Sequence, residues 1–448
     1  MNSTTILHRL TQAGLPAPAA ERKAELFHQA SLQLKHSRED RPAEESRYFV
    51  PGRIEVLGKH TDYAGGRSLL CTVEHGFCVV TSPRSDSCVR VMDVARRQEC
   101  QFVLSEDLDT ASNDWSVYPK TVTRRIARNF PGRMRGVDMV FASDLPSAAG
   151  LSSSSAFVIA TFLAISKRNN LEHHPAYRDN IKSREDLATY LGCVENGQTF
   201  GALAGDLGVG TFGGSEDHIA ILCCCAGQLS QFRFCPVRLE RTVALPRDHV
   251  FVIGVSGVTA EKTGTARGKY NRAAQAAGAI LEIWQTASGR TDSTLFEAIV
   301  HSPDAPQRIR QLLSQSQSGY SAEILVERLD QFVDECAHII PGAVEALAQD
   351  NLVEFGKLVD RSQAGAERGL GNQVAETLYL ARSARELGAA AASPFGAGFG
   401  GAVWAMIKSE RAEDFRAKWR DLYQARFPDL ANPSNFFVER TGPSVLCL

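Results

Sequence analysis

The chain has 448 residues, 44% of them hydrophobic, so it is long enough to form two domains that share a cleft. Its formal net charge of -2, with 22% charged residues, lacks the basic excess that nucleic-acid binding usually needs. The longest apolar stretch, residues 219–226, is far too short to cross a bilayer. We therefore expect neither a nucleic acid nor a membrane as a partner.

The eleven cysteines are spread over a long chain, and Cys223, Cys224 and Cys225 are consecutive within an apolar run. This run predicts a buried strand with reduced thiols, which indicates a cytoplasmic protein. No cysteine pair has the CxxC spacing of zinc sites, and the first twenty residues lack the apolar core of a secretory signal. The sequence thus favours neither a disulfide framework nor a zinc site.

The apolar spacing predicts a helical lead-in over residues 4–36, followed by several short strands over residues 48–103. Helices packed on that sheet are then predicted at residues 115–129, 152–166 and 184–200. Further strands are predicted at residues 219–225, 229–234 and 250–255, and mostly helical patterns over residues 262–390.

Helices and strands are segregated along the chain instead of alternating strictly, which favours an α+β fold over a doubly wound sheet. Pro246 and alternating charges interrupt the pattern near residues 238–247. We therefore expect a first domain over residues 1–240 and a second over residues 241–448.

Three glycine- and serine-rich stretches lie at residues 51–63, 145–156 and 396–401. In the middle stretch a Gly-Leu turn leads into four serines and an apolar helix, so backbone N–H groups and hydroxyls can bind phosphate oxygens. No GxxxxGK[ST] sequence occurs, which excludes a P-loop. The stretch therefore predicts a nucleotide-phosphate site that lacks a P-loop lysine.

The last stretch places Gly396, Gly398 and Gly401 at the spacing of a dinucleotide fingerprint. In a Rossmann unit such a loop follows a strand and opens a helix, whereas here a helical segment, 374–392, precedes it and a strand-like segment, 402–407, follows it. This order disfavours NAD binding. A tight turn that contacts no ligand stays open as an alternative.

The first stretch concentrates Arg53, Lys59, His60 and Asp62 between apolar strand residues and a glycine turn. Such groups are costly to bury without partners, and they suit recognition of a polyhydroxylated substrate by directional hydrogen bonds. An ion-paired hairpin is the alternative.

A second polar cluster, residues 213–218, precedes the apolar run 219–225. A carboxylate there could accept a hydroxyl proton during phosphoryl transfer, with Arg53 stabilising the charge. The sequence alone does not separate Asp217 from Glu216 in this role.

Together these stretches resemble those of the GHMP kinases, specifically the galactokinase branch. Residues 51–66 are similar to the galactokinase signature, residues 145–156 to the family's phosphate loop, and residues 396–401 to its C-terminal glycine motif. The resemblance runs from about residue 48 to the C-terminus. It implies a two-domain GHMP kinase fold, with an N-terminal ribosomal-protein-S5-domain-2-like part, a C-terminal ferredoxin-like part and the active site in the cleft.

The resemblance also implies residue roles. Asp217 corresponds to the catalytic base and Arg53 to its partner, while Ser154 and Glu195 correspond to ligands of Mg²⁺. Sugar contacts are implied for His60, Asp62, Gly214 and Tyr270, and at the position of Lys59. ATP phosphate contacts are implied for Gly150, Leu151, Ser152, Ser153 and Ser154. The implied activity is an ATP- and Mg²⁺-dependent sugar 1-kinase related to galactose metabolism, and a monomer is compatible with it.

The sequence departs from the family pattern at several points. Galactokinases have a glutamate, implied to bind the sugar's 6-hydroxyl, where this chain has Lys59, and usually an asparagine where it has Glu55. A lysine pairs well with a carboxylate, so a uronic acid such as galacturonate is an alternative substrate. Lys59 could instead face solvent or Glu55, with galactose as the substrate. The segment from Glu195 to Asp217 is also longer than usual.

Two other classes stay open beside an active sugar kinase. One is a non-catalytic homologue that senses sugar and ATP, which the presence of Arg53, Ser154 and Asp217 disfavours. The other is a kinase for an isoprenoid or amino-acid alcohol, which the sequence His60-Thr-Asp-Tyr63 disfavours.

Overall fold

The structure is a computed structural model that describes residues 3–36, 44–112, 114–146, 150–210, 213–258, 265–315, 319–396 and 398–448. Within residues 265–270 it describes the backbone but not the side chains. In the described part, no helix is long and apolar enough to cross a membrane.

The larger of two sheets has eight strands, in the order β12-β1-β2-β5-β3-β4, with β6 paired to β2 and β7 paired to β6. Neighbours are antiparallel, except that β3 and β5 are parallel. The strands are β1 (Ser46–Leu57), β2 (Arg67–Pro83), β3 (Cys88–Asp93), β4 (Gln98–Val103), β5 (Val137–Ser143), β6 (Gln228–Arg233), β7 (Arg238–Ala244) and β12 (Leu446–Cys447).

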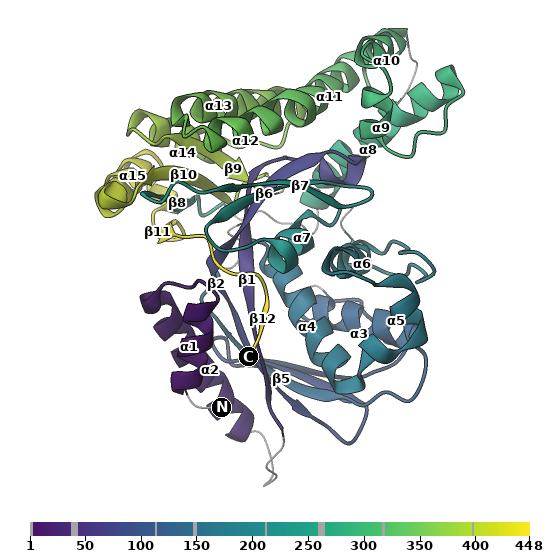
Figure 1. The fold of residues 1–448 in the computed structure, drawn as a ribbon, viewed down its shortest axis with the longest axis vertical. Coiled ribbons are helices and arrows are strands. Elements are labelled where there is room, and N and C mark those ends of the chain that lie inside the picture. Colours follow the sequence, from purple (N-terminus) through teal and green to yellow (C-terminus); the bar gives the residue numbers. More distant parts are fainter. Residues whose placement is uncertain are drawn as a thin grey trace.

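Helices cover both faces of this sheet. Alternate residues of its central strands point to opposite sides, and since apolar side chains lie on both sides, both faces have to be covered. Val140 of β5 packs in the cluster with the N-terminal helices α1 (Ser3–Gln12) and α2 (Ala17–His36), whereas Phe141 packs in the larger core. That core holds α3 (Val117–Asn129), α4 (Ser153–Asn169), α6 (Arg184–Asn196) and α7 (Glu216–Cys223), which Figure 1 shows on the other side of β1 and β2 from α1 and α2. Short segments near them are η1 (Asp62–Ala64), η2 (Leu171–His173) and α5 (Pro175–Asn180).

The second sheet has four antiparallel strands in the order β11-β8-β10-β9. They are β8 (His249–Val255), β9 (Ala391–Phe395), β10 (Ala402–Lys408) and β11 (Asn435–Glu439). A small core places α14 (Ala375–Glu386) and α15 (Ala412–Arg426) against these strands. The change from one sheet to the other falls between Ala244 and His249, and the chain returns to the first sheet in β12.

The remaining helices form the upper layer of Figure 1 and include a separate core around Trp284 and Phe332. They are α8 (Thr265–Ser288), α9 (Leu295–Val300), α10 (Ala305–Gln315), α11 (Ala322–Asp334), the π-helix η3 (Glu335–Ile339), α12 (Ile340–Ala348) and α13 (Leu352–Gly369). The 3-10 turns η4 (Ser409–Arg411) and η5 (Pro428–Leu430) flank α15.

The mixed helix and strand content confirms the predicted α+β class, and most predicted elements are present. The strand predicted at residues 219–225 is wrong, because this run is the helix α7 followed by an exposed Cys225. A short apolar run has no periodicity that separates a buried helix from a buried strand. The helix predicted over residues 374–392 ends at Glu386, and residues 391 and 392 of that range belong to the strand β9.

Candidate active site

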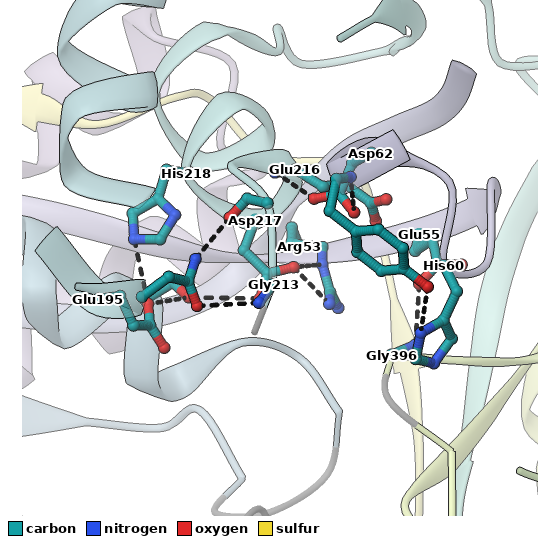
Figure 2. A pocket seen from close by; sticks show the side chains of 14 residues that line it. Arg53, Glu55, His60, Asp62, Glu195, Gly213, Glu216, Asp217, His218 and Gly396 are labelled. Carbon is teal, nitrogen blue, oxygen red and sulfur yellow. Dashed lines mark hydrogen bonds and ion pairs between the residues drawn. The ribbon is translucent and has the colours of Figure 1, made fainter. Parts of the chain in front are cut away.

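A polar cavity lies where the larger sheet meets the glycine turn of the smaller one. It encloses about 550 Å³ of empty space, solvent at its mouth included. Its walls come from β1, the turn after β1, α4, α6, α7 and Gly396, the residue that follows β9 (Figure 2). Segments far apart in the sequence therefore place their polar side chains in one concave site, as ligand sites usually do.

The predicted pair of Arg53 and Asp217 is at the centre of this cavity. Arg53 Nε and Nη2 lie 2.7 and 2.6 Å from Asp217 Oδ1, and the guanidinium also donates to the carbonyl of Gly150. Burial is the largest single effect and opposes the charge of Arg53, but the carboxylates of Asp217, Glu216 and Glu55 together outweigh it and raise the pKa of the guanidinium. Asp217 is partly exposed to the cavity, so its carboxylate is oriented and accessible to a substrate.

The two acidic candidates that the sequence leaves open are distinguishable in the structure. Glu216, the first residue of α7, turns inward and accepts a hydrogen bond from Ser68 Oγ at 2.8 Å. Burial, with the nearby carboxylates of Glu55 and Asp62, raises its pKa well above the usual value. Because Glu216 is buried against Ser68 whereas Asp217 is accessible from the cavity, the geometry favours Asp217 as the base.

The serine run places a different side chain beside these carboxylates from the one predicted. Ser155 Oγ lies 2.8 Å from Glu195 Oε2 and 3.3 Å from Asp217 Oδ2, whereas Ser154 lines a neighbouring cavity with Glu195 and hydrogen-bonds Tyr118. His218 Nε2 lies 3.1 Å from Glu195 Oε2. Sequence analysis missed Ser155, because α4 is buried on all sides and its apolar pattern indicates no preferred face.

Asp62 and Gly214 meet at the next part of the wall. Asp62 accepts hydrogen bonds from the backbone N–H groups of Tyr63 and Glu216, at 2.8 and 3.1 Å, and burial raises its pKa. A Cβ atom on Gly214 would lie 2.2 Å from Asp62 Oδ2. Glycine at position 214 is thus required for Asp62 to reach the start of α7.

His60 lines the cavity from the turn after β1. Its Nδ1 lies 3.2 Å from Tyr63 Oη. Arg328, a buried residue of α11, donates to the His60 carbonyl at 2.5 Å and to Tyr63 Oη at 3.2 Å. The helical layer therefore fixes the turn that carries His60 and Asp62. No local sequence pattern indicates Arg328, because it lies 268 positions from His60 along the chain.

Lys59 is not among the residues that line the polar cavity. Its side chain is buried, and Nζ donates to Ser393 Oγ at 2.7 Å. The carboxyl groups of Glu55 and Glu335 interact electrostatically with it. The structure therefore matches the alternative in which Lys59 faces acidic neighbours, and this placement does not support a lysine contact with a uronic acid. Tyr270 lies in α8, but its side chain is outside the described residues.

The predicted phosphate loop ends at the N-terminus of α4, and its residues 147–149 are outside the described part. Ser152 is in the left-handed region at φ 58°, its side chain makes no cap, and its buried Oγ has no described partner. The first N–H groups of α4 have no intrahelical acceptor. Gly150 (φ 75°) lies close to Phe395, just before the glycine turn. The N–H groups at the start of α4 and the Ser152 hydroxyl are donors that suit an anion.

A second, aromatic cavity adjoins this helix end and encloses about 1390 Å³, solvent included. It shares Glu195 with the polar cavity and also contains Ser153 and Ser154. Its aromatic walls are Phe77, Trp115, Tyr118, Phe141 and Phe157. The Phe141 and Phe157 rings lie 5.0 Å apart between their centres. A flat heterocycle can stack against such an aromatic wall, and no local sequence pattern marks the wall because its residues are dispersed over 80 positions.

Three family models match the chain in order. The galactokinase galactose-binding signature matches residues 37–83, the GHMP kinases N terminal domain residues 117–214, and the GHMP kinases C terminal domain residues 343–425. The first of these spans the turn with His60 and Asp62, and the second spans α4 and α6.

Two relatives are galactokinases. The one from Roseiflexus sp. (strain RS-1) is 26% identical over 401 residues, which are 88% of this chain and 91% of the relative. The galactokinase from Actinobacillus pleuropneumoniae is 26% identical over 379 residues, which are 84% of this chain and 88% of the relative. Among solved structures, Lactococcus lactis galactokinase complexed with galactose has a TM-score of 0.74 at 23% identity, covering 90% of this chain and 95% of its own. Methanococcus jannaschii mevalonate kinase has a TM-score of 0.53 at 12% identity, and the match covers 90% of this chain and 99% of that kinase.

The chain belongs to the GHMP kinases and, within them, to the galactokinase-like group. It is a sugar kinase with the two-domain GHMP fold, and ATP is the phosphoryl donor that this family of kinases implies.

Proposed function

We propose that this kinase transfers the γ-phosphoryl group of ATP to the anomeric hydroxyl of galactose or a closely related neutral hexose. The observation that carries the proposal is the Arg53–Asp217 pair, whose Nη2 to Oδ1 distance is 2.6 Å, in a cavity that opens beside the N-terminus of α4. The names of the two relatives support galactose as the substrate, since both are galactokinases. The polar walls of the cavity suit a polyhydroxylated substrate.

In this mechanism Asp217 Oδ accepts the proton of the anomeric hydroxyl while that oxygen bonds to the γ-phosphorus, and the bond to the β,γ-bridging oxygen breaks to release ADP. Arg53 orients Asp217 and lies where it can offset the negative charge of the transferred group. Most of the rate gain in phosphoryl transfer comes from positioning and electrostatics.

The nucleotide would lie across the N-terminal end of α4. We propose that its phosphates bind the N–H groups and hydroxyls of residues 150–154, and that its base stacks against the rings that line the aromatic cavity.

The donor set also fits Mg²⁺, which prefers a few carboxylate or hydroxyl oxygens and substrate phosphates. Glu195 would hold the ion with Ser155 or, as the resemblance to galactokinases implies, with Ser154, since both serines adjoin cavities that contain Glu195. Mg²⁺ bound there would reduce the negative charge of the phosphates.

The proposal is tested by incubating the purified protein with ATP and Mg²⁺ and measuring ADP release with a panel of free hexoses, pentoses and uronic acids. We expect turnover with galactose or a C4-axial neutral hexose. Turnover with galacturonate alone would replace the proposed substrate with the uronic acid, and no turnover with any sugar would refute the proposal.

A further inference from the structure

Glu55 is a buried carboxylate of β1 that the mechanism above does not use. Only 5% of the residue is exposed, yet it lines the polar cavity. Its Oε2 accepts a hydrogen bond from the Gly396 N–H at 3.1 Å. Its Oε1 is buried and has no hydrogen-bond partner among the described residues. Because a buried carboxylate oxygen without a donor is costly, Oε1 is suited to accept a hydrogen bond from a donor bound in the cavity that Glu55 lines.

Charged groups from three elements face Glu55. Burial is the largest effect and raises the pKa of Glu55 to about 7. Arg53 on the same strand and Lys59 in the following turn lower it, and so does the Gly396 N–H, whereas Asp217 of α7 raises it. Glu216 is a further acidic neighbour. Near neutral pH both the protonated and the ionised form of Glu55 are therefore accessible, and its two cationic neighbours favour the ionised form.

We propose that Glu55 Oε1 accepts a hydrogen bond from a hydroxyl of the bound sugar and so determines which sugars the cavity accepts. The inference rests on the proposed function, because it assumes a sugar beside Asp217. A hydroxyl is the suitable donor, since a substrate carboxylate would face the carboxyl groups of Glu55, Asp62 and Asp217. Glu55 is thus a substrate-binding residue.

Lys59 acts through Glu55 and is a positioning residue. Its buried ammonium, held by Ser393 Oγ, stabilises the ionised form of Glu55 without lining the cavity. Relative to galactokinases, this chain has a lysine in place of a glutamate at position 59 and a glutamate in place of an asparagine at position 55. One carboxylate, that of Glu55, therefore still lies at the cavity wall, and the ammonium of Lys59 lies behind it.

The first test compares wild type and Glu55→Gln with galactose and its monodeoxy analogues, each with ATP. We expect the wild type to discriminate against one monodeoxy analogue by about 10–100-fold in kcat/KM, the range for hydrogen bonds to a charged group. Glu55→Gln should lose about 10–100-fold in kcat/KM for galactose and discriminate against that analogue only a few-fold. Unchanged discrimination against every analogue in Glu55→Gln would overturn the proposal.

The second test uses the pH profile of kcat/KM. The pKa of Glu55 is raised, so its ionised form, and the hydrogen bond it accepts, are lost as the pH falls through about 7. We expect an acidic limb near pH 7 in the wild type, its absence in Glu55→Gln, and its shift to higher pH in Lys59→Gln. An identical limb in all three proteins would contradict the assignment.

Glu74→Gln is the matched control. Glu74 is likewise a buried glutamate with a raised pKa and one carboxylate oxygen without a partner among the described residues, but it lies on β2 and lines neither cavity. It should keep the wild-type discrimination and pH profile. Calorimetric titration with the same sugars in the absence of ATP compares the sugar affinities of wild type and Glu55→Gln independently of turnover. A wild type that turns over no sugar would thus refute the proposed function, while equal sugar binding in Glu55→Gln and wild type would refute the role of Glu55.

Discussion

Asp217 is held by Arg53 on one side and approached by Ser155 on the other, so its carboxylate has a fixed orientation at the cavity wall. Replacing Asp217 with Asn keeps the size of the side chain and removes the proton acceptor. We expect kcat to fall at least about 10²–10⁴-fold, the usual contribution of a general base. ATP affinity, measured by equilibrium titration, should change little.

Two control variants make this result specific. Glu216→Gln removes the neighbouring carboxyl, which is buried on Ser68, and should reduce kcat far less. Asp421→Asn changes an exposed aspartate of α15 and should have no effect. If Asp217→Asn retained wild-type turnover while Glu216→Gln lost it, Glu216 would be the base.

The serine run offers a second comparison of neighbouring residues. Ser155 Oγ is 2.8 Å from Glu195, so Ser155→Ala should raise the Mg²⁺ concentration for half-maximal activity by about 10–100-fold, the effect typical of groups that support a metal site. Ser154→Ala should raise it less, because Ser154 faces the aromatic cavity. Titration of activity with Mg²⁺ at saturating ATP measures both, and the opposite ranking would assign the ion to Ser154.

At the residue scale, sequence analysis selected Arg53, His60, Asp62, Gly214 and Asp217, all of which line or shape one cavity. Arg53, His60 and Asp62 were selected because polar residues between apolar strand residues are costly unless they are used, whereas Gly214 and the choice of Asp217 over Glu216 came from the resemblance to galactokinases. It could not separate four consecutive serines, since successive helical residues point about 100° apart and no polar face marked the direction. It also could not show that Lys59 turns away from the cavity.

At the scale of elements, α11 supports the turn after β1 through one buried side chain. Arg328→Met would remove the donors to the His60 carbonyl and Tyr63 Oη and leave these acceptors buried. We expect the free energy of unfolding to fall by about 2–4 kcal/mol and the KM for the sugar to rise about 10-fold, with a smaller change in the KM for ATP.

Denaturant unfolding and steady-state kinetics measure these changes. Arg382→Met removes an arginine of α14 that is exposed and paired with Glu367, so it should change stability by less than about 0.5 kcal/mol. Equal KM values for the sugar in Arg328→Met and wild type would show that α11 does not support the turn.

The predicted elements differ in how well local sequence defines them. The strand β8 and the helices α3 and α4 were predicted within a few residues, because their apolar runs are long and bounded by turn residues. The eight-residue helix α7 was predicted as a strand, because its run from Ile219 to Cys223 is uniformly apolar. Asp217 consequently lies in the first turn of a helix and not at the end of a strand.

At the scale of the molecule, the cavity depends on contacts between distant parts of the chain. Arg53 comes from β1 and Asp217 from α7, while Gly396 follows β9 of the other sheet and donates to Glu55. The resemblance to GHMP kinases predicted that such a cleft exists. It did not predict the neighbours that follow from tertiary packing, namely Ser155, Arg328 and the rings of the aromatic cavity.

The central claim is that the anomeric oxygen of a hexose receives the phosphoryl group. Phosphorus NMR of the product from galactose, ATP and Mg²⁺ tests it most directly, because a phosphate on C1 couples to the anomeric proton. We predict a single sugar phosphate with this coupling, and its loss in Asp217→Asn. A phosphate on any other carbon, or no sugar phosphate from any hexose, would contradict the account.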